Sequence, residues 1–583
     1  MAMLWISLII GIPWLGAFII WLIGDRNERL QHGFAILFSA LAGVSSILLL
    51  FSPTSQPVIY LPMGDAFGDF TFNADGLGVF LSVVATVIGC LAVVFSADYM
   101  KNEVQLSRYY AFILFFIGSM AGLVLTTNLL LIFVFWEMTA LCSYALISFH
   151  NDDPKAVVGG IKALIITQVG GIGLMVGALF IYATTGSFDI NQFIAAAPSI
   201  PSGVLSVAAF GFLIAAAAKS AQFPFQTWLP DAMEAPTPIS ALIHAATMVN
   251  AGVYLLIRFY PAFEAVPGWK TAVIIVGLLS ALLAALMAIF ATDLKRVLAY
   301  STVSQLGYMV YAIGAGGLFA SSLHLMSHSV FKALLFLAAG AVIHGTGTRD
   351  MRKMGNLSKQ IPVIRNVFIV GAMSLAGLPI LNGFWSKELI LEAGLVHGPL
   401  WAYVIMLIVA GLTAFYTFRC VWMVFFANPS SELHGHEAGS AMKIALYLLA
   451  FGTLTTWLLA GPFSHLLDST MAAHHFHAGM TLDFVMEVLT APATYLALIV
   501  VGLGLLAWWQ RSKLTGIQKS FNWLGWSAKH SFGFEAVNRG IVSLTIGAAG
   551  LLRNTQTGYL PWNIFGIIAS LIIIIGIVAI GAG

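Results

Sequence analysis

Ionisable side chains occur inside long apolar stretches of this sequence, where a charge is costly unless it is paired or neutralised. Lys219 lies deep in one such stretch, five residues before Pro224, a residue that has no backbone N–H to donate. Lysine, histidine and glutamate can all bind and release protons, so their presence in apolar segments indicates an ion path. The candidate proton-transfer residues are Glu137, Lys219, His244, His324, His328, Lys332, Lys387 and Glu388.

Glu137 is the one charged residue between positions 127 and 147. A carboxylate in such a segment either pairs with a cation or stays protonated, and Lys219 is the nearest candidate cation in the order of the apolar segments. Separating this pair would weaken the hold of the lysine on its proton, which predicts a proton-transfer switch. The alternative is a structural ion pair that only holds two helices together.

Two apolar stretches are interrupted close to a lysine. Pro224 follows Lys219, and the break Gly377-Leu378-Pro379 precedes Lys387 and Glu388. Interrupted spans at corresponding positions of two halves are typical of transporters built from inverted repeats. We therefore expect the two lysines to be equivalent stations on one path.

His324, His328 and Lys332 recur at i, i+4 and i+8, so a helix would place them on one face. Two histidines at this spacing can ligate a metal, but the next residue on the face is a lysine, which favours a proton relay over a metal site. His244 would connect Lys219 to this row. The alternative is that these are core histidines satisfied by hydroxyl groups.

The composition is that of a membrane protein with many spans. Hydrophobic residues make up 60% of the 583 residues and charged residues 9%, and the mean hydropathy is +0.93. Lysine and arginine are scattered, which argues against nucleic acid as a partner. Cys90, Cys142 and Cys420 lie far apart, and no nucleotide-binding motif is present, so we expect no redox cofactor in this chain.

About sixteen apolar windows are long enough to cross a bilayer, so we predict an all-α polytopic fold with two inverted repeats and broken helices. Basic residues concentrate in alternate connections, which predicts an outer N-terminus in a cytoplasmic membrane. The outer connection 464–491 has no lysine or arginine. Its histidines could bind adventitious metal, but we expect them to be solvated loop residues: His465, His474, His475 and His477. Basic residues assigned to the outer side are Arg258 and Lys270. The windows begin near residues 4, 33, 78, 109, 129, 160, 204, 237, 271, 297, 317, 364, 400, 443, 491 and 562.

The predicted organisation follows these windows. Residues 511–561 are too polar to cross a bilayer, and the mixture of apolar and basic residues between 534 and 552 predicts an amphipathic helix lying laterally in the membrane interface. A short linker is the alternative. The predicted parts are N-terminal spans (1–108), a first half-channel repeat (109–260), a second inverted repeat (261–428), C-terminal spans (429–510), the lateral helix (511–561) and a final anchoring span (562–583).

Several long motifs resemble those of one family, the antiporter-like membrane subunits shared by respiratory complex I and Mrp-type sodium/proton antiporters. The motifs are Phe135-Trp136-Glu137, Lys219 to Met233, Pro236 to Val249, Asp293 to Gly307 and His324 to Phe336. The segment after residue 510 is similar to that of the distal, largest antiporter-like subunit of complex I. At Gln168-Val169-Gly170-Gly171 the chain departs from that subunit, in which an arginine and an acid are usual, and leans toward the Mrp type.

The resemblance implies a role for each candidate residue. Lys219 would be the central station of the first half-channel with Glu137 as its modulating partner, and Lys387 with Glu388 would serve the second. The implied function is proton translocation within an NADH or related donor:quinone oxidoreductase, with flavin, iron–sulfur clusters and quinone in partner subunits. Its partners would be other antiporter-like and membrane-arm subunits and lipid. The alternatives are a sodium/proton antiporter subunit and the membrane subunit of an energy-coupled inorganic-carbon uptake complex.

Overall fold

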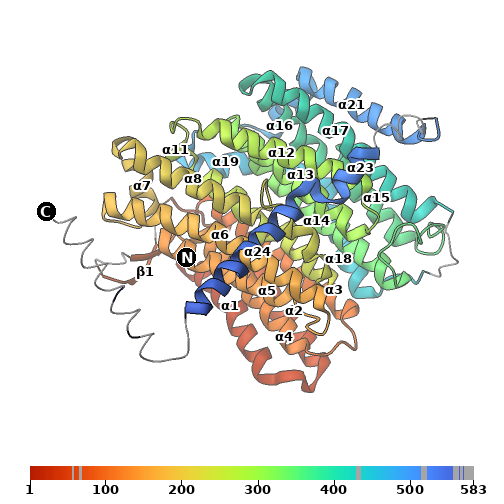
Figure 1. Cartoon of the computed structure of the whole chain (residues 1–583), viewed down its shortest axis with the longest axis horizontal. Helices are drawn as coiled ribbons and strands as arrows, with labels where there is room; N and C mark the ends of the chain where they lie inside the picture. Colours follow the sequence, from red (N-terminus) through yellow and green to blue (C-terminus); the bar gives the residue numbers. More distant parts are fainter. Residues whose placement is uncertain are drawn as a thin grey trace. The chain divides into compact units, whose positions relative to one another are not determined.

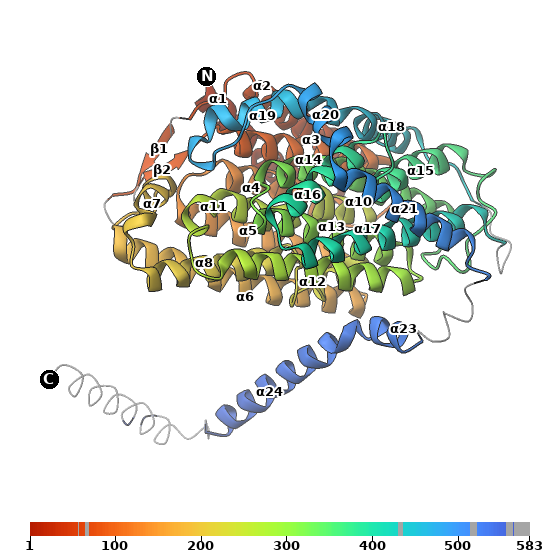
Figure 2. The same cartoon turned by 90° about the horizontal axis from the view of Figure 1, so that it is seen from above.

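The computed structural model describes residues 1–55, 58–64, 69–428, 435–513 and 522–555, together with Ile564 and Ala569. Within these ranges the chain is predominantly helical, with one antiparallel two-stranded hairpin (Figures 1 and 2). Two compact units make up the chain, Met1–Gly525 and Trp526–Gly583.

The elements of the first unit follow one another through short connections. The first group is α1 (Ala2–Ile23), α2 (Glu28–Leu49), β1 (Val58–Pro62), β2 (Asp69–Phe72), α3 (Gly76–Tyr99), α4 (Leu106–Leu125), α5 (Leu129–Ile147), α6 (Pro154–Thr185) and α7 (Ile190–Ala196). The second group is α8 (Ser202–Lys219), α9 (Trp228–Asp231), α10 (Thr237–Ala241), the π-helical turn η4 (Leu242–Ala246), α11 (Met248–Phe263), α12 (Trp269–Phe290), α13 (Leu294–Gly314) and α14 (Leu318–Thr346). The third group is α15 (Pro362–Ala376), α16 (Asn382–His397), α17 (Leu400–Val421), the π-helical turn η5 (Trp422–Phe426), α18 (Ser440–Thr455), α19 (Ala460–Thr470), α20 (Thr481–Thr490), α21 (Pro492–Trp509) and α23 (Asn522–Lys529), which runs into the second unit.

Polar capping residues fix where several helices begin. The Asp75 side chain accepts from the backbone N–H of Gly78 at the start of α3, and the Asn128 side chain accepts from the first turn of α5. Asp153 caps α6 and Asp293 caps α13 in the same way. Each cap satisfies backbone donors that an apolar run leaves unpaired, so these boundaries follow from the local sequence.

Thirteen helical segments of the described residues are long and apolar enough to cross a membrane. The windows predicted near residues 297 and 364 also form helices, α13 and α15. They are not among the thirteen, because α13 is not apolar enough and α15 has only 15 residues. The window predicted near residue 562 lies outside the described residues. A polytopic helical membrane fold is therefore confirmed, with thirteen clear spans.

Burial separates central helices from peripheral ones. The apolar window within Thr237–Phe263 is 100% buried inside the protein and that within Leu318–Thr346 is 89% buried, whereas that within Pro492–Trp509 is 22% buried. Both views place α14 among other helices (Figures 1 and 2). The helices that carry the candidate histidines are therefore surrounded by protein, while α21 faces its surroundings.

In the second unit, α24 (Phe534–Thr555) is one continuous helix (Figure 1). Val537, Ile541, Leu544 and Leu551 recur at i, i+4, i+7 and i+14 and are exposed, so they form an apolar face. Arg553 stands in the last turn, where a positive charge is favourable to the helix dipole. The predicted amphipathic helix at 534–552 is present. Apart from Ile564 and Ala569, the predicted anchoring span 562–583 lies outside the described residues.

Candidate functional site

Lys219 is the last residue of α8 and is fully buried. Its Nζ donates to the backbone oxygen of Trp136 at 2.7 Å and lies 4.9 Å from the centre of the Trp136 ring. The helix is interrupted after Lys219 and resumes at Trp228, as Pro224 predicts. One carbonyl and one aromatic face thus hold the amine without an acidic partner in hydrogen-bonding contact.

Residues of α12 and α13 hold the interrupted backbone after Lys219 in place. The amide of Gln222 donates to the backbone oxygens of Ser220 and Val303, and the N–H of Phe223 donates to Ser280 Oγ at 2.8 Å. Ser280 lies on α12 and Val303 on α13, so these two helices position the break. Displacement of these helices would move the Lys219 segment.

Glu137 directly follows Trp136 on α5 and is half-buried. Its Oε2 accepts a short hydrogen bond from the side-chain amide of Gln168, and its Oε1 has no hydrogen-bond partner among the described residues. A methyl group added at Gly171 would lie 2.2 Å from Oε1, so this glycine makes room for the carboxylate. The predicted pair with Lys219 is not a direct contact, although the two groups are near enough to interact electrostatically.

His244 lies in the π-helical turn η4, which separates α10 from α11. The ring is fully buried, 4.6 Å from the ring of Phe336, and neither nitrogen has a hydrogen-bond partner in the described part of the chain. Single π-helical turns inside α-helices are frequent at functional sites. An imidazole with two free nitrogens in a buried position is suited to exchange protons through water.

The row predicted on α14 is present. His324 contacts Ser386 Oγ at 2.9 Å and Gln305 Oε1 at 3.2 Å, and its ring centre is 6.4 Å from that of His328. Lys332 donates to Ser301 Oγ in a short hydrogen bond. All of these side chains are buried.

His328 lies at the middle of this row. Both of its nitrogens lack hydrogen-bond partners within the described ranges. It is near enough to His324, Lys332 and His244 to feel their charge. The structure thus brings together the four central residues of the predicted path.

Lys387 and Glu388 lie on α16, directly after the break that separates it from α15. Lys387 Nζ donates to the backbone oxygen of Ala376 at 3.1 Å and lies 5.9 Å from the ring centre of Tyr308. Gly377 has a φ of +80° and a methyl group there would meet Lys387 Cε at 2.7 Å. Both lysine stations therefore share one arrangement, a buried amine held by a backbone carbonyl and an aromatic ring beside a helix break.

The connection between Lys219 and the histidine row of α14 is less direct than the contacts within that row. Among the described residues no hydrogen bond connects it to His244. The polar side chains that link their helices are Ser220, which donates to the Val249 oxygen, and Asn250, which donates to Ser329 Oγ on α14. A proton passing between the halves would need water beside these groups.

Several polar partners were not foreseen from the sequence. Gln168, Ser301, Gln305 and Ser386 each contact a predicted residue. Neutral amides and hydroxyls are common in membrane helices, so only their contacts in the structure identify these four residues as part of the candidate site. Within the described residues no three His, Cys, Asp or Glu side chains are grouped so that they could hold a metal ion.

One expectation about the outer connections is wrong, and one basic residue there has an unforeseen partner. His474, predicted to be solvated, is buried, and its Nε2 contacts the backbone oxygens of Ile257 and Arg258 at 3.1 Å. Arg258, assigned to the outer side, is buried within α11 and donates to both oxygens of Asp75, at 2.5 and 3.0 Å. Asp75 neutralises the arginine, which makes its burial tolerable.

Comparison with known proteins identifies the family. Residues 126–413 match the family described as "NADH:quinone oxidoreductase/Mrp antiporter, TM", and residues 60–110 match "NADH-Ubiquinone oxidoreductase (complex I), chain 5 N-terminus". The NADH-quinone oxidoreductase subunit L of Pseudomonas aeruginosa is 35% identical over 595 aligned positions, which cover 95% of this chain and 96% of that protein. This chain belongs to the NADH:quinone oxidoreductase/Mrp antiporter family. The predicted resemblance is thereby confirmed.

Similarity to other members of the NADH:quinone oxidoreductase/Mrp antiporter family supports this assignment. The NAD(P)H-quinone oxidoreductase chain 5 of Picosynechococcus is 37% identical over 508 positions, covering 79% of this chain and 76% of that protein. A chain in the structure of the Mrp complex from Dietzia superimposes with a TM-score of 0.84 at 28% identity. That superposition covers 98% of this chain and 63% of the Dietzia chain.

Proposed function

We propose that this chain is a proton-translocating membrane subunit of a complex I-like oxidoreductase that transfers electrons from NADH or a related donor to a quinone. The observation that carries the proposal is the row of buried ionisable groups from His244 through Lys332 to Glu388. None of them forms an ion pair among the described residues. Such groups are expensive inside a membrane, which argues that they serve ion movement.

The two lysines act as stations that load and release protons. A lysine amine held by one carbonyl can give up a proton and keep its hydrogen bond, because the neutral amine still has N–H groups to donate. Lys219 receives a proton and passes it through water toward His244. Imidazoles accept a proton on one nitrogen and release one from the other, which carries it along α14 to Lys387. Glu137 tunes the charge state of Lys219.

Partner subunits carry the electron transfer in this proposal. Flavin, iron–sulfur clusters and quinone are held by those partners, and this chain supplies neither a redox cofactor nor a metal site. Its neighbours are other antiporter-like subunits, further membrane-arm subunits and lipid, with no nucleic acid. As a subunit it takes part in a translocase reaction without performing the redox step.

The proposed topology has sixteen spans in a cytoplasmic membrane, with the N-terminus outside. The two inverted repeats span 109–260 and 261–428, and each contains one of the lysines beside a break. The similar surroundings of Lys219 and Lys387 support this symmetry. Labelling single cysteines introduced at Lys101 and Lys270 from either side would test the orientation, since the proposal places these positions on opposite sides.

The test of function uses the purified complex in vesicles. NADH-driven acidification of the vesicle interior is measured with a quenched dye, beside the rate of quinone reduction. Lys219→Ala is expected to abolish proton transfer by this subunit while all subunits remain assembled. Lys101→Ala, which changes an exposed lysine, is the matched control and should pump normally. Equal pumping by the two variants would refute the proposal.

Sodium/proton exchange is the second candidate. The similarity to a chain of the Dietzia Mrp complex and the Gln168 partner of Glu137 favour it. If protons alone are moved, acidification is unchanged when sodium is replaced by potassium. Uptake of ²²Na⁺ driven by a pH difference, and lost in Lys219→Ala, would favour exchange instead.

The segment 511–561 is proposed to lie along the cytoplasmic face and hold neighbouring subunits together. Its amphipathic helix α24 has an exposed apolar face that suits a membrane interface. Truncation after Gln510 tests this role. Loss of the subunit during purification supports a clamp, whereas a fully assembled complex that has lost only pumping would contradict it.

A further inference from the structure

An open pocket of about 390 Å³ lies at one end of the helix bundle of the first unit. It is lined by the turn before α14, the second half of α16, the segment 474–477 and α20. Its titratable side chains are Glu392, His397, His474, His475, His477 and Glu487. None of these belongs to the path described above.

This end is opposite the basic loop that follows α14. Leu318, which begins α14, lines the pocket, and the loop with Arg349 follows the other end of the helix. A helix of 29 residues is roughly 43 Å long, so the pocket and the loop are separated by the thickness of a membrane. In the proposed orientation the pocket opens to the outside.

Two carboxylates of α16, Glu392 at the pocket and Glu388 in the interior, lie one helical turn apart. Glu392 follows Glu388 by four residues on α16, so the two side chains lie on the same helical face with Cβ atoms about 6 Å apart. Both have an Oε2 that is buried without a hydrogen-bond partner among the described residues. Glu388 is 1% exposed, whereas Glu392 is partly exposed and lines the pocket.

Tyr403 of α17 is near enough to both carboxylates to interact with them electrostatically. It is 2% exposed, its hydroxyl has no partner within the described ranges, and it feels the charges of Glu388 and Glu392. Tyr311 of α13, also with an unpartnered hydroxyl, is near Tyr403. Buried hydroxyls and carboxylates are nearly always hydrogen-bonded, so these unpartnered atoms are suited to bind water.

Glu487 continues the series on the far side of the pocket. It lies on α20, outside the membrane-spanning helices, and burial together with the nearby charge of Glu392 raises the pKa of its carboxyl. His475 and His477 are exposed at the same pocket. Titratable groups therefore extend from buried Glu388 to solvent.

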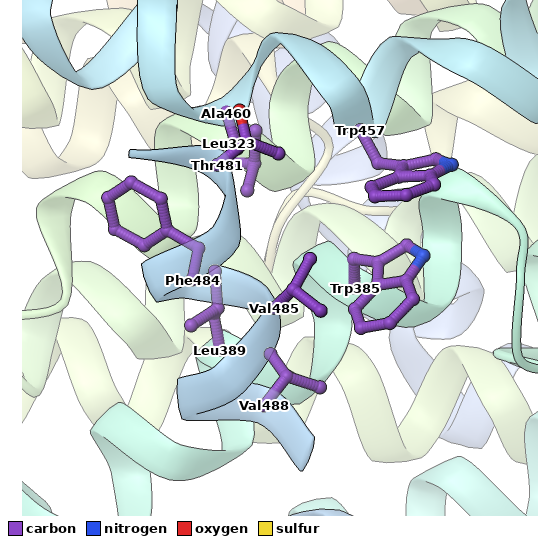
Figure 3. Close-up of a pocket in the computed structure, with 9 residues that line it drawn as sticks. All are labelled: Leu323, Trp385, Leu389, Trp457, Ala460, Thr481, Phe484, Val485 and Val488. Carbon is purple, nitrogen blue, oxygen red and sulfur yellow. The ribbon is translucent and has the colours of Figure 1, made fainter. Parts of the chain in front are cut away.

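Closer to the start of α16, one to two turns before Glu392, apolar side chains close the same face of the helix. Trp385 stacks on Trp457 with ring centres 5.1 Å apart, and Val485 and Val488 of α20 point toward Trp385 (Figure 3). The cavity left between them is about 10 Å³, at the lower limit for one water molecule, and its lining is almost wholly apolar. Protons at Glu388 thus have a polar route through Glu392 and no comparable route past Trp385.

We infer that Glu392 and Glu487 form the exchange path between Glu388 and the aqueous phase at this end of the protein. The inference rests on the proposed function. A proton leaves the Glu388 carboxyl for the Tyr403 hydroxyl or a water molecule, which gives its own proton to the Glu392 carboxylate. Glu392 passes the proton to Glu487 or to pocket water and is again a carboxylate, and Glu388 returns to its starting state when it takes the next proton from Lys387.

The experiment measures proton pumping by the whole complex in vesicles. Glu392→Gln keeps the shape of the side chain but cannot carry a proton, and we expect it to lower the initial pumping rate at least about tenfold. Glu487→Gln should lower it less, because pocket water and histidines can replace this step. Asp468→Asn, an exposed carboxylate of α19 that does not line the pocket, should pump like the unmodified complex.

Conservative replacement separates proton transfer from a structural role. Glu392→Asp retains a carboxyl group and should recover at least half of the rate lost in Glu392→Gln. Pumping by Glu392→Gln at the rate of Asp468→Asn, or equal losses in the Asp and Gln variants, would overturn the inference. If Lys219→Ala also pumped normally, the proposed function would fail as well; loss in Lys219→Ala with normal pumping in Glu392→Gln would refute only the exchange path.

Discussion

Replacement of Lys219 by arginine isolates the ability of this residue to release a proton. Lys219 has one hydrogen-bond acceptor, the Trp136 oxygen at 2.7 Å, and one aromatic neighbour. A guanidinium can also donate to this carbonyl and lie against the Trp136 ring. Lys219→Arg therefore keeps the positive charge and both contacts. The change therefore acts mainly on proton release.

The magnitude follows from the intrinsic difference between the two side chains. Free arginine and lysine differ by about 2 to 3 pKa units, which corresponds to roughly 3 to 5 kcal/mol for removing the proton. The carbonyl and the ring interact favourably with either cation. We therefore expect the same difference in pKa between arginine and lysine inside the site. Proton release should become about 100- to 1,000-fold slower, and pumping should fall to about a hundredth of the normal rate or less once this step limits it.

The assay compares initial rates of NADH-driven proton uptake into vesicles at equal amounts of assembled complex. Subunit content is checked by gel and mass spectrometry, and Lys101→Arg is the matched control at an exposed position. Pumping by Lys219→Arg at more than half the normal rate would refute the reasoning, since it would show that Lys219 need not release its proton.

Three further changes test the surroundings of the site. Glu137→Gln should impair pumping several-fold and Glu137→Asp less, in the same vesicle assay; equal pumping by both would reduce Glu137 to a structural role. Gly171→Ala places a methyl group 2.2 Å from Glu137 Oε1 and should lower the pumping rate, whereas Gly203→Ala, which meets nothing within 4 Å, should not; similar rates would contradict the packing argument. Asp75→Asn removes the charge that neutralises buried Arg258 and should destabilise the subunit by about 3 to 5 kcal/mol, seen as a lower Tm of the complex or loss of assembly. An unchanged Tm with full assembly would count against that ion pair.

The helical framework could be predicted because its determinants are local. Apolar runs of span length predicted the central helices, and capping residues such as Asp75 and Asp293 mark where they begin. The breaks after Lys219 and before Lys387 follow from proline and glycine in the sequence. The periodicity of His324 and Lys332 placed them on one face, as α14 shows.

Contacts between distant segments could not be predicted in this way. Lys219 and Glu137 were expected to pair, yet the lysine donates to the Trp136 backbone and the carboxylate accepts from Gln168. A backbone carbonyl has no sequence signature, and an amide in a membrane helix has little. The ion pair of Arg258 with Asp75 was not predicted, because the two residues are 183 positions apart in the sequence.

The residues of the proposed exchange path were likewise only partly predictable from the sequence. The spacing of Glu388 and Glu392 was visible in the sequence, but not the pocket that Glu392 lines. That pocket requires α20 to fold back on α16, which no local pattern specifies. Tyr403 adds a hydroxyl that only the packing of α17 brings near the two carboxylates.

The most direct test of the central claim is the number of protons moved per NADH oxidised by a complex with Lys332→Met in this subunit. Lys332 donates to Ser301 Oγ and is near enough to His328 to influence its charge, and methionine fills a similar volume without carrying a proton. The account predicts that this ratio falls while every subunit remains assembled. An unchanged ratio at a normal rate of quinone reduction would contradict it.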